Sequence, residues 1–423
     1  MRSSRLVAVA EPIREPTAAT PTLLATLSGP DRTGVSSHLF ACLDDLPVEV
    51  LDVEQVVVRG HLTLALLLAA GDRVEAVTER IAAAGADLGM AVTTQLGSGD
   101  SHRASRTGRA AVTVLGAPLT GRAFGAVTAA VAATGANIDR ILRLSRYPVT
   151  TIECDVSGAD VTSLRAELAA VSVREGVDVA VSPSGLARRG RRLVVLDVDS
   201  TLIQDEVIEL LAAKADREEE VRAVTEAAMR GELDFAQSLR ERVAVLEGLP
   251  ERVLDEVARE VRLTPGARTL VRTLHRLGYT VALVSGGFTP IVENIAADLG
   301  ISRVRANMLE VVDGRLTGRV TGTVVDRAGK ASALREFAAA EGLPLSRTVA
   351  IGDGANDLDM LQAAGFGVAF NAKPVVREQA HTSVNVPYLD TVLFLLGIAR
   401  EEIEEADLLD DDPGPLTEGA ASA

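Results

Sequence analysis

The pattern of hydrophobic and polar positions divides the chain into three regions. Between residues 20 and 97, apolar runs and helix-like spacing alternate in the order strand, helix, strand, strand, helix, strand. The same order returns between residues 108 and 184, after a linker at 98–109 that is rich in Ser, Gly and Arg. We interpret the two segments as two copies of one α+β, ferredoxin-like unit.

The third region, residues 190–400, follows a basic linker and has strands of a different kind. Its strand candidates are continuous apolar runs that alternate with helices, at 193–198, 280–285, 348–352 and 367–370. Runs that are apolar on both faces indicate a parallel sheet with helices on both sides. The segment from about 205 to 262 contains no strand run and is predicted to form a helical cap. The pattern therefore predicts an α/β, Rossmann-like domain with an inserted cap.

The two ends of the chain lack this regular pattern. Residues 1–19 are predicted to form a loose tail, and the acidic segment 401–423 a disordered one. The longest apolar run, 62–70, is too short to span a bilayer, and the first residues lack the apolar core of a signal peptide. We therefore expect a cytoplasmic protein.

Composition excludes some classes of function. The net charge of −16 argues against a nucleic-acid partner, because such binding needs a basic surface. A small anionic substrate remains compatible with it, since a local pocket can be positive. Cys42 and Cys154 lie too far apart in sequence to suggest a disulfide framework or a thiolate metal site.

Candidate chemistry begins where the first apolar run of the third region ends. The segment DVDST places Asp197 and Asp199 at the carboxyl end of a predicted strand, where ligand sites of open α/β sheets gather. One Asp carboxylate can attack phosphorus and form an acyl phosphate. A second carboxyl can protonate the leaving oxygen and later deprotonate water. A single Asp-x-Asp pair is weak evidence for a phosphatase. The residues at the ends of the other predicted strands are therefore needed to interpret it.

Three further polar groups follow the later strands and helices. Ser285 and two glycines end the second parallel run, and their hydroxyl and backbone N–H groups suit a phosphate oxygen. Asp353 and Asp357 in GDGANDLDM follow the third run and can face one cation. Lys330 opens a helix after a predicted hairpin. The Gly residues before Lys330 do not form a Walker A loop, and GDGAND is not a dinucleotide-binding motif.

Together, these four motifs resemble the haloacid dehalogenase superfamily of phosphatases. The resemblance implies that Asp197 is the nucleophile and Asp199 the general acid and base, and that Ser285 and Lys330 bind phosphate. It also implies Mg²⁺ as cofactor, held by Asp197, Asp199, Asp353, Asp357 and the backbone carbonyl of Val198. A carboxyl group two residues after the nucleophile favours hydrolysis over a lasting aspartyl phosphate.

Within that superfamily, the segments DVDSTLIQDEVIELLA, VSGGF and GDGANDLDML resemble phosphoserine phosphatases over nearly all of residues 192–398. This resemblance implies hydrolysis of O-phospho-L-serine, the last step of L-serine biosynthesis. Glu206 would bind the ammonium group and Arg242 the carboxylate of the substrate. The remaining implied contacts come from Met229 and Phe235, which pack over the substrate, and from Gly286 and Asn356.

The N-terminal pair of units resembles ACT domains, small regulatory modules that bind amino acids. GPDRTG (29–34) and GAPLTG (116–121) fall at the strand-to-helix turn where such modules bind ligands. The resemblance implies an L-serine or other amino-acid effector, with Gly29, Asp31, Gly116 and Asn137 as candidate contacts, and a homodimer. A purely dimerising role without a ligand remains an alternative.

Two alternatives to a phosphoserine phosphatase stay open at this point. The same catalytic groups could act on phosphohomoserine, phosphothreonine or a phosphopeptide. Glu206 and Arg242 favour a free amino acid, because a peptide lacks the paired charges. An amino-acid sensor with a secondary phosphatase domain is the other alternative, and the complete set of catalytic residues argues against it.

Overall fold

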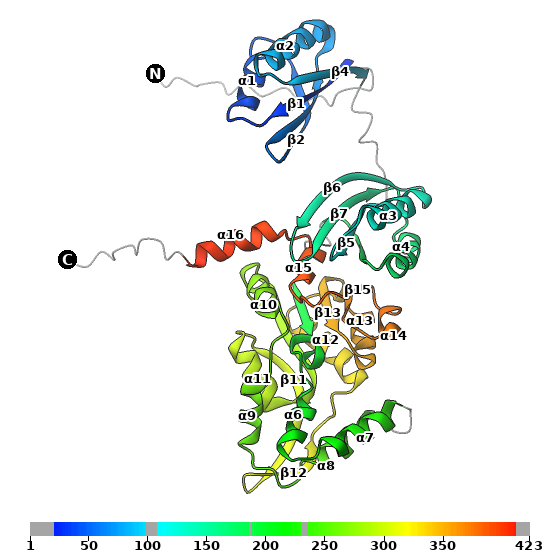
Figure 1. The fold of residues 1–423 in the computed structure, drawn as a ribbon, viewed down its shortest axis with the longest axis vertical. Coiled ribbons are helices and arrows are strands. Elements are labelled where there is room, and N and C mark those ends of the chain that lie inside the picture. The colour runs from blue at the N-terminus through cyan, green and yellow to red at the C-terminus, as the bar shows by residue number, and fades with distance from the viewer. Residues whose placement is uncertain are drawn as a thin grey trace, which may run out of the picture. The chain divides into compact units, whose positions relative to one another are not determined.

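The computed structural model describes residues 21–98, 108–185, 188, 190, 192–229 and 235–411. The chain forms two compact units, residues 1–106 and residues 107–423 (Figure 1). Among the helices of the described residues, none is long and apolar enough to cross a membrane.

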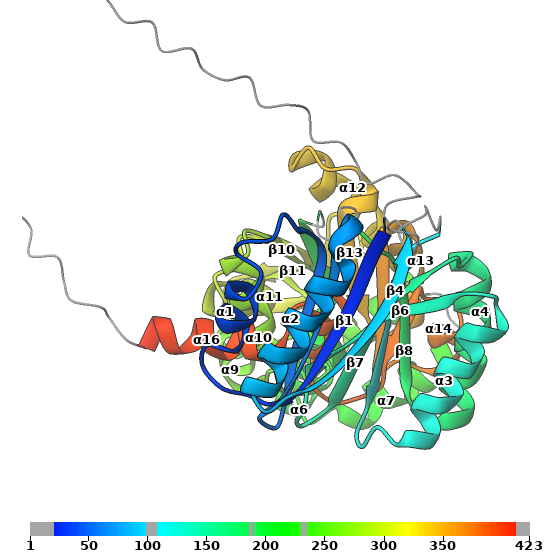
Figure 2. The same cartoon turned by 90° about the horizontal axis from the view of Figure 1, so that it is seen from above.

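Within residues 21–98, four strands form an antiparallel sheet in the order β2-β3-β1-β4, with α1 and α2 packed against it (Figure 2). Strand β3 buries Leu62, Leu64, Leu66 and Leu68, every second residue, because alternate side chains of a strand share a face. The predicted element order is observed here. The elements are β1 (Pro21–Pro30), α1 (Val35–Ala41), β2 (Glu49–Val58), β3 (His61–Ala69), α2 (Val74–Asp87) and β4 (Ala91–Ser98).

The second unit begins with a repeat of this arrangement, in the order β6-β7-β5-β8. Side-chain caps start its two helices: Thr120 accepts a hydrogen bond from the Ala123 N–H, and Asp160 from the Ser163 N–H. The repeat comprises β5 (Ala110–Gly116), α3 (Gly121–Ala133), β6 (Asn137–Ser145), β7 (Thr150–Ser157), α4 (Val161–Glu175) and β8 (Asp178–Pro183).

Residues 193–384 contain a sheet of seven strands in the order β12-β11-β10-β9-β13-β14-β15. Strands β11, β10, β9, β13, β14 and β15 run parallel, and β12 pairs with β11 as an antiparallel hairpin around Asp313-Gly314. The strands are β9 (Leu193–Leu196), β10 (Thr280–Phe288), β11 (Arg303–Val312), β12 (Arg315–Thr321), β13 (Thr348–Gly352), β14 (Phe366–Phe370) and β15 (Thr382–Val384).

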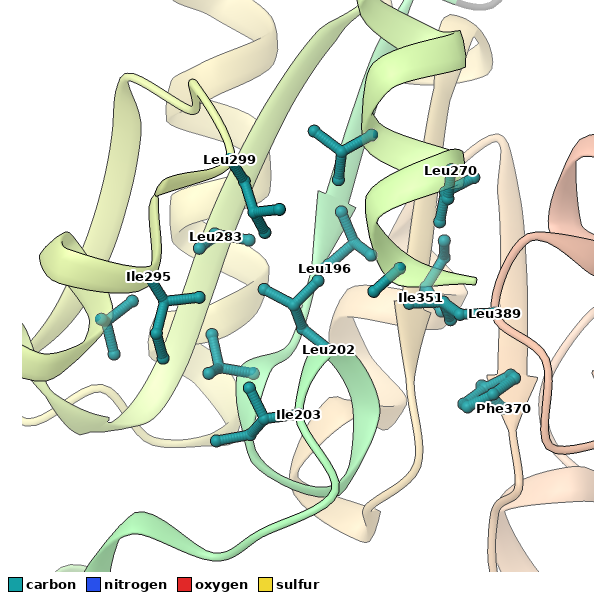
Figure 3. Packing of buried hydrophobic residues seen from close by; sticks show 14 of the residues in the cluster. Leu196, Leu202, Ile203, Leu270, Leu283, Ile295, Leu299, Ile351, Phe370 and Leu389 are labelled. Atoms are coloured by element: carbon teal, nitrogen blue, oxygen red, sulfur yellow. The ribbon is translucent and has the colours of Figure 1, made fainter. Parts of the chain in front are cut away.

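Helices cover both faces of this parallel sheet. Helices α10 and α11 lie on one side, and α13 and α14 on the other (Figure 1). Leu196, Leu283 and Ile351 from three neighbouring strands meet Leu270 and Ile295 in one core (Figure 3). The helices are α10 (Ala267–Arg276), α11 (Thr289–Asp298), α12 (Arg327–Ala340), α13 (Leu358–Ala363), α14 (Pro374–Arg377) and α15 (Thr391–Leu395).

The segment that follows β9 is helical, as the sequence predicts. Its helices are α6 (Val207–Lys214), α7 (Glu218–Met229), α8 (Phe235–Ala244) and α9 (Val253–Glu260). The observed architecture confirms the predicted fold class, a parallel α/β sheet with a helical insertion preceded by two α+β units.

The prediction of a disordered C-terminal tail is wrong for residues 401–411, which belong to helix α16 (Arg400–Asp411). Ile403 is buried, and Asp407 accepts hydrogen bonds from Arg272 and Arg276. These contacts offset the negative charge of Asp407. The composition of the segment by itself suggests only acidic side chains that repel one another. Residues 412–423, like the predicted N-terminal tail 1–19, lie outside the described residues.

The second α+β repeat and the parallel-sheet region form one compact unit, although the sequence presents them as separate domains. Asp178 of β8 accepts hydrogen bonds from the backbone N–H and the Nδ2 of Asn385, at 2.7 and 2.5 Å. Burial raises the pKa of Asp178, and the Asn385 donors oppose that effect. Leu115, Leu144 and Ala180 belong to the same hydrophobic core as residues of the seven-stranded sheet. All of β5 is therefore buried, whereas β1 of the first unit is not.

Burial also determines the reactivity of Cys154, which lies within the second repeat. Desolvation, followed by the charges of Glu153 and Asp155, raises the pKa of Cys154 to about 11. The thiolate is the reactive form, so in a Cys42→Ser variant we expect labelling of native Cys154 at pH 8 to be at least about a hundredfold slower than in urea. Alkylation rates followed by mass spectrometry measure this. Equal rates in the native and unfolded protein would show that Cys154 is accessible and ionisable.

Candidate active site

The predicted functional side chains meet at one edge of the parallel sheet. Strands β10, β9, β13 and β14 are consecutive parallel neighbours, so their carboxyl ends lie along the same edge. Asp197 and Asp199 follow β9, Ser285 and Gly286 lie near the end of β10, and Asp353 follows β13. Residues that are far apart in sequence are brought together by this topology.

A cavity of about 430 Å³ opens at this edge, between the sheet and the helical insertion. Its volume lies in the range of pockets for small molecules. Eight of the predicted residues line it: Asp197, Asp199, Glu206, Arg242, Gly286, Lys330, Asp353 and Asn356.

The loop after β9 presents two carboxylates with different partners. Asp197 is 4% exposed and accepts hydrogen bonds from the Val198 N–H at 2.8 Å and from Lys330 Nζ at 2.7 Å. Asp199 accepts from the Val207 N–H at 2.8 Å and from the Ser285 hydroxyl at 3.1 Å. Ser285 in turn accepts from the Gly287 N–H at 2.7 Å, which fixes its hydroxyl.

Burial raises the pKa of both carboxyl groups. For Asp199, desolvation is the main cause, and the hydrogen bonds from Val207 and Ser285 oppose it. For Asp197, desolvation and the nearby charge of Asp357 raise the pKa, and the Lys330 ammonium opposes them. An elevated pKa suits a carboxyl group that donates a proton.

Three carboxylates form a compact group beside Lys330. One oxygen each of Asp197, Asp353 and Asp357 lies within 4.8 Å of the others. Lys330 is fully buried and contacts both Asp197 and Asp357 at 2.7 Å. Burial alone would lower the pKa of Lys330, but these two charges raise it.

This group has the chemistry of a hard divalent-cation site. Three carboxylates and one ammonium leave two negative charges in a buried place, and burial with the Asp357 charge raises the pKa of Asp353 to about 6. Oxygen donors at this spacing fit Mg²⁺. The fourth predicted ligand, Asp199, is outside this group among the described residues and points to Ser285 and Val207 instead.

Close packing around Asp357 explains a glycine of the GDGAND motif. A Cβ atom at Gly352 would lie 2.4 Å from the Asp357 carboxyl carbon, so a side chain there would displace the carboxylate. The Gly354 N–H donates to the same carboxylate at 2.9 Å. The two glycines of the motif therefore help to position the Asp357 carboxylate, one by leaving room for it and the other by donating a backbone hydrogen bond.

The helical insertion contributes one negative and one positive side chain to the cavity. Glu206, before α6, accepts a hydrogen bond from the Ser200 hydroxyl at 2.7 Å, and burial followed by the Asp199 charge raises the pKa of Glu206 to about 7. Arg242 of α8 donates to the Ser238 carbonyl at 3.3 Å, and burial lowers its pKa. Met229 and Phe235 end α7 and begin α8, and their side chains lie outside the described residues.

The residues that support or line the site and that the sequence analysis missed include Thr201, Asn307 and Lys373. Thr201 donates to Asp353 at 3.0 Å, and Asn307 holds the β10 turn by donating to the Gly286 carbonyl at 2.8 Å. Lys373 lines the cavity after β14. Thr201 lies in the quoted DVDST motif, and Lys373 could have been found by examining the end of the fourth apolar run. Asn307 lies in a strand and carries no such signal.

Within the second repeat, the candidate effector residues lie at separate places in the sheet. Gly29 is buried near the end of β1, and the Asp31 N–H donates to the Gly60 carbonyl at 2.8 Å. In the second repeat, Gly116 pairs with Thr150 of β7 and Asn137 pairs with Ser157. These partners are separated by roughly 20 Å along the strand, so one amino acid cannot contact both residues within a single repeat.

Comparison with known proteins covers nearly the whole chain. Residues 194–362 match the haloacid dehalogenase-like hydrolase family, and residues 21–95 and 109–182 each match an ACT domain family. The phosphoserine phosphatase of Streptomyces coelicolor is 59% identical over 396 residues, which are 93% of this chain and 96% of that protein. The chain belongs to the phosphoserine phosphatase family.

Other members of the family extend this result. Phosphoserine phosphatase SerB2 of Mycobacterium tuberculosis is 53% identical over 390 residues, 91% of this chain and 95% of that protein. A crystal structure of a probable phosphoserine phosphatase from Vibrio cholerae has a TM-score of 0.55 and 36% identity, covering 70% of this chain and 88% of that one. Hydrolases of the haloacid dehalogenase group generally use a divalent metal, and the group of Asp197, Asp353 and Asp357 fits one.

Proposed function

We propose that the protein hydrolyses O-phospho-L-serine to L-serine and phosphate with Mg²⁺, as the last step of L-serine biosynthesis. The observation that carries the proposal is one cavity that joins the Asp197 and Asp199 carboxyl groups to the opposite charges of Glu206 and Arg242. A free amino acid presents an ammonium and a carboxylate, so these two side chains match both of its charges. The identity to phosphoserine phosphatases over nearly the full chain supports the substrate.

In the first half of the reaction, a carboxylate oxygen of Asp197 forms a bond to phosphorus while the bond from phosphorus to the serine oxygen breaks. Asp199, in its protonated form, gives its proton to that oxygen. Lys330 and the Ser285 hydroxyl face the phosphoryl oxygens and stabilise their charge. The products of this half are L-serine and an aspartyl phosphate on Asp197.

In the second half, the Asp199 carboxylate takes a proton from water as the water oxygen bonds to phosphorus. The bond between phosphorus and the Asp197 oxygen breaks, and inorganic phosphate leaves. The proton returns Asp199 to its starting form, so the same residue acts first as acid and then as base.

Asp197, Asp353 and Asp357 would hold Mg²⁺, with Asp199 and the Val198 carbonyl as further candidates named from the family resemblance. The ion would supply positive charge against the phosphoryl oxygens and offset the surplus of carboxylates. Met229, Phe235, Gly286 and Asn356 are proposed to complete the substrate pocket.

The direct test is phosphate release from O-phospho-L-serine by the Mg²⁺-loaded full-length protein, beside O-phosphothreonine and a phosphoserine peptide. We expect turnover of phosphoserine to be strongest. Preference for the peptide would move the function to protein dephosphorylation, and absence of turnover on all three would refute the proposal.

Arg242→Ala is predicted to impair recognition of the substrate carboxylate selectively. Loss of a charge-assisted contact is expected to raise KM for phosphoserine by about a hundredfold. O-phosphoethanolamine, which lacks the carboxylate, should be hydrolysed with the same KM by both proteins. Steady-state kinetics on the two substrates measure the difference, and equal losses on both would mean that Arg242 has a general structural role.

We also propose that the two ACT units bind an amino-acid effector such as L-serine and support a homodimer in the cytoplasm. The edge strand β2 exposes Val53, Val56 and Val58 at 48%, 55% and 63%, which favours association with a second copy. The free thiols of Cys42 and Cys154 fit a reducing compartment. Light scattering with and without L-serine tests both points, and a monomeric, serine-insensitive enzyme would exclude them.

A further inference from the structure

The chain uses arginine for almost all of its positive charges. Of its 43 Lys and Arg residues, only Lys214, Lys330 and Lys373 are lysine. Two of these three line the same cavity, Lys330 and Lys373. Lysine differs from arginine in presenting a compact point charge on a flexible stem. The use of lysine at two positions of one cavity, in a chain that otherwise favours arginine, indicates a requirement for that geometry.

Lys373 lies at a further strand end of the edge where the site is built. It follows β14, the neighbour of β13, and lines the cavity beside Gly354, Ala355 and Asn356 of the turn after β13. Its side chain is exposed. Within the described part of the chain, no hydrogen bond or ion pair engages its ammonium group.

The other positively charged side chains that line the cavity, Lys330 and Arg242, each have an observed or a proposed partner. Lys330 is buried between Asp197 and Asp357, and Arg242 lies on the helical insertion, where its proposed partner is the substrate carboxylate. A phosphate dianion that enters the cavity is repelled by those of the lining carboxyl groups of Asp199, Glu206 and Asp353 that are ionised. An ammonium at the exposed side of the cavity offsets that repulsion.

We propose that Lys373 is a substrate-binding residue that receives the phosphate dianion as it enters the cavity and contacts inorganic phosphate as it leaves. This inference rests on the proposed phosphatase function and adds a binding residue to it. Lys373 acts on binding and not on the transfer step, because its side chain is solvent-exposed while Lys330 is buried against the proposed nucleophile. Lys373 supplies an exposed positive charge for the entering phosphate, whereas Lys330 lies buried beside the proposed nucleophile.

The test compares wild type with Lys373→Gln, Lys373→Arg and the matched control Lys214→Gln, whose lysine pairs with Glu260 on the helical insertion. We expect Lys373→Gln to raise KM for O-phospho-L-serine by about tenfold with kcat within about twofold. Added salt should lower kcat/KM less in this variant than in wild type, because one attractive charge is missing. Lys373→Arg should recover only part of the loss, because it keeps the charge but not the compact ammonium group, and Lys214→Gln should match wild type.

Calorimetric titration of the Mg²⁺-loaded proteins with inorganic phosphate tests the role of Lys373 independently of which phosphorylated substrate the protein hydrolyses. We expect Lys373→Gln to bind phosphate about tenfold more weakly than wild type. If wild type fails to hydrolyse phosphoserine, the proposed function is wrong, and the phosphate titration still decides the role of Lys373. Equal phosphate affinity in both proteins, or a fall in kcat with unchanged KM, would overturn the proposal.

Discussion

Asp197→Asn is expected to abolish phosphate release, with a fall in kcat of at least about a thousandfold. The amide has almost the shape of the carboxylate and can still accept hydrogen bonds from Val198 and Lys330. It lacks the negative oxygen that attacks phosphorus, so the acyl phosphate cannot form. The fold should be retained, since the substitution changes no packing volume.

The measurement is single-turnover release of phosphate from O-phospho-L-serine, together with mass spectrometry of the quenched wild-type enzyme for a phosphorylated aspartate. Asp359→Asn is the matched control, because Asp359 lies in the GDGANDLDM motif of the same site but pairs with Arg327 at the surface. That control should keep wild-type turnover. Substantial activity in Asp197→Asn would remove Asp197 as the nucleophile.

Arg188→Met is expected to destabilise the second unit by about 3–5 kcal/mol. Arg188 and Glu153 form a buried ion pair, with side chains 9% and 10% exposed. The Arg188 guanidinium also donates to the Leu395 carbonyl at 3.1 Å, so it joins β7 to helix α15 across the junction between the ACT unit and the catalytic sheet. Its removal leaves the Glu153 charge buried without a partner, which is the main part of the cost.

Urea unfolding followed by circular dichroism and by loss of activity measures the effect. Arg143→Met is the control, because the ion pair of Arg143 with Glu401 is about half exposed and contributes at most about 1 kcal/mol. The double variant Glu153→Leu with Arg188→Met should recover part of the lost stability, since neither charge then remains buried. A single variant as stable as wild type would show that the pair is solvated.

Local patterns predicted the fold well because each of its units has a characteristic period. Alternating leucines of β3 and the continuous runs of β9 and β13 distinguish a half-exposed sheet from a fully covered one. The Asp-Gly hairpin and the helical insertion were predicted for the same kind of reason. The C-terminal helix α16 was missed because Arg272 and Arg276, which neutralise Asp407, come from a distant part of the chain.

Much of the candidate site was also accessible from sequence, because the carboxyl ends of neighbouring parallel strands must meet at one edge. Asp197, Ser285 and Asp353 could be placed together by that rule. The same rule, applied to the fourth run, would have found Lys373. The support that Asn307 gives to Gly286 could not have been found, because it depends on the contact between strand β11 and the turn after β10.

The amino-acid sequence alone was sufficient for the identity of the units, their order and the candidate catalytic residues, since these depend on periodicity and on motifs within short segments. Tertiary structure decided which carboxylates lie close enough to share a cation. Asp357 lies in the same group as Asp197, while Asp199 lies outside it and accepts a hydrogen bond from Ser285. It also decided that the second ACT unit packs onto the catalytic sheet through Asp178 and Asn385. Burial and proximity of charges, which set the pKa of each acid, are properties of the packed chain and appear only when distant segments come into contact.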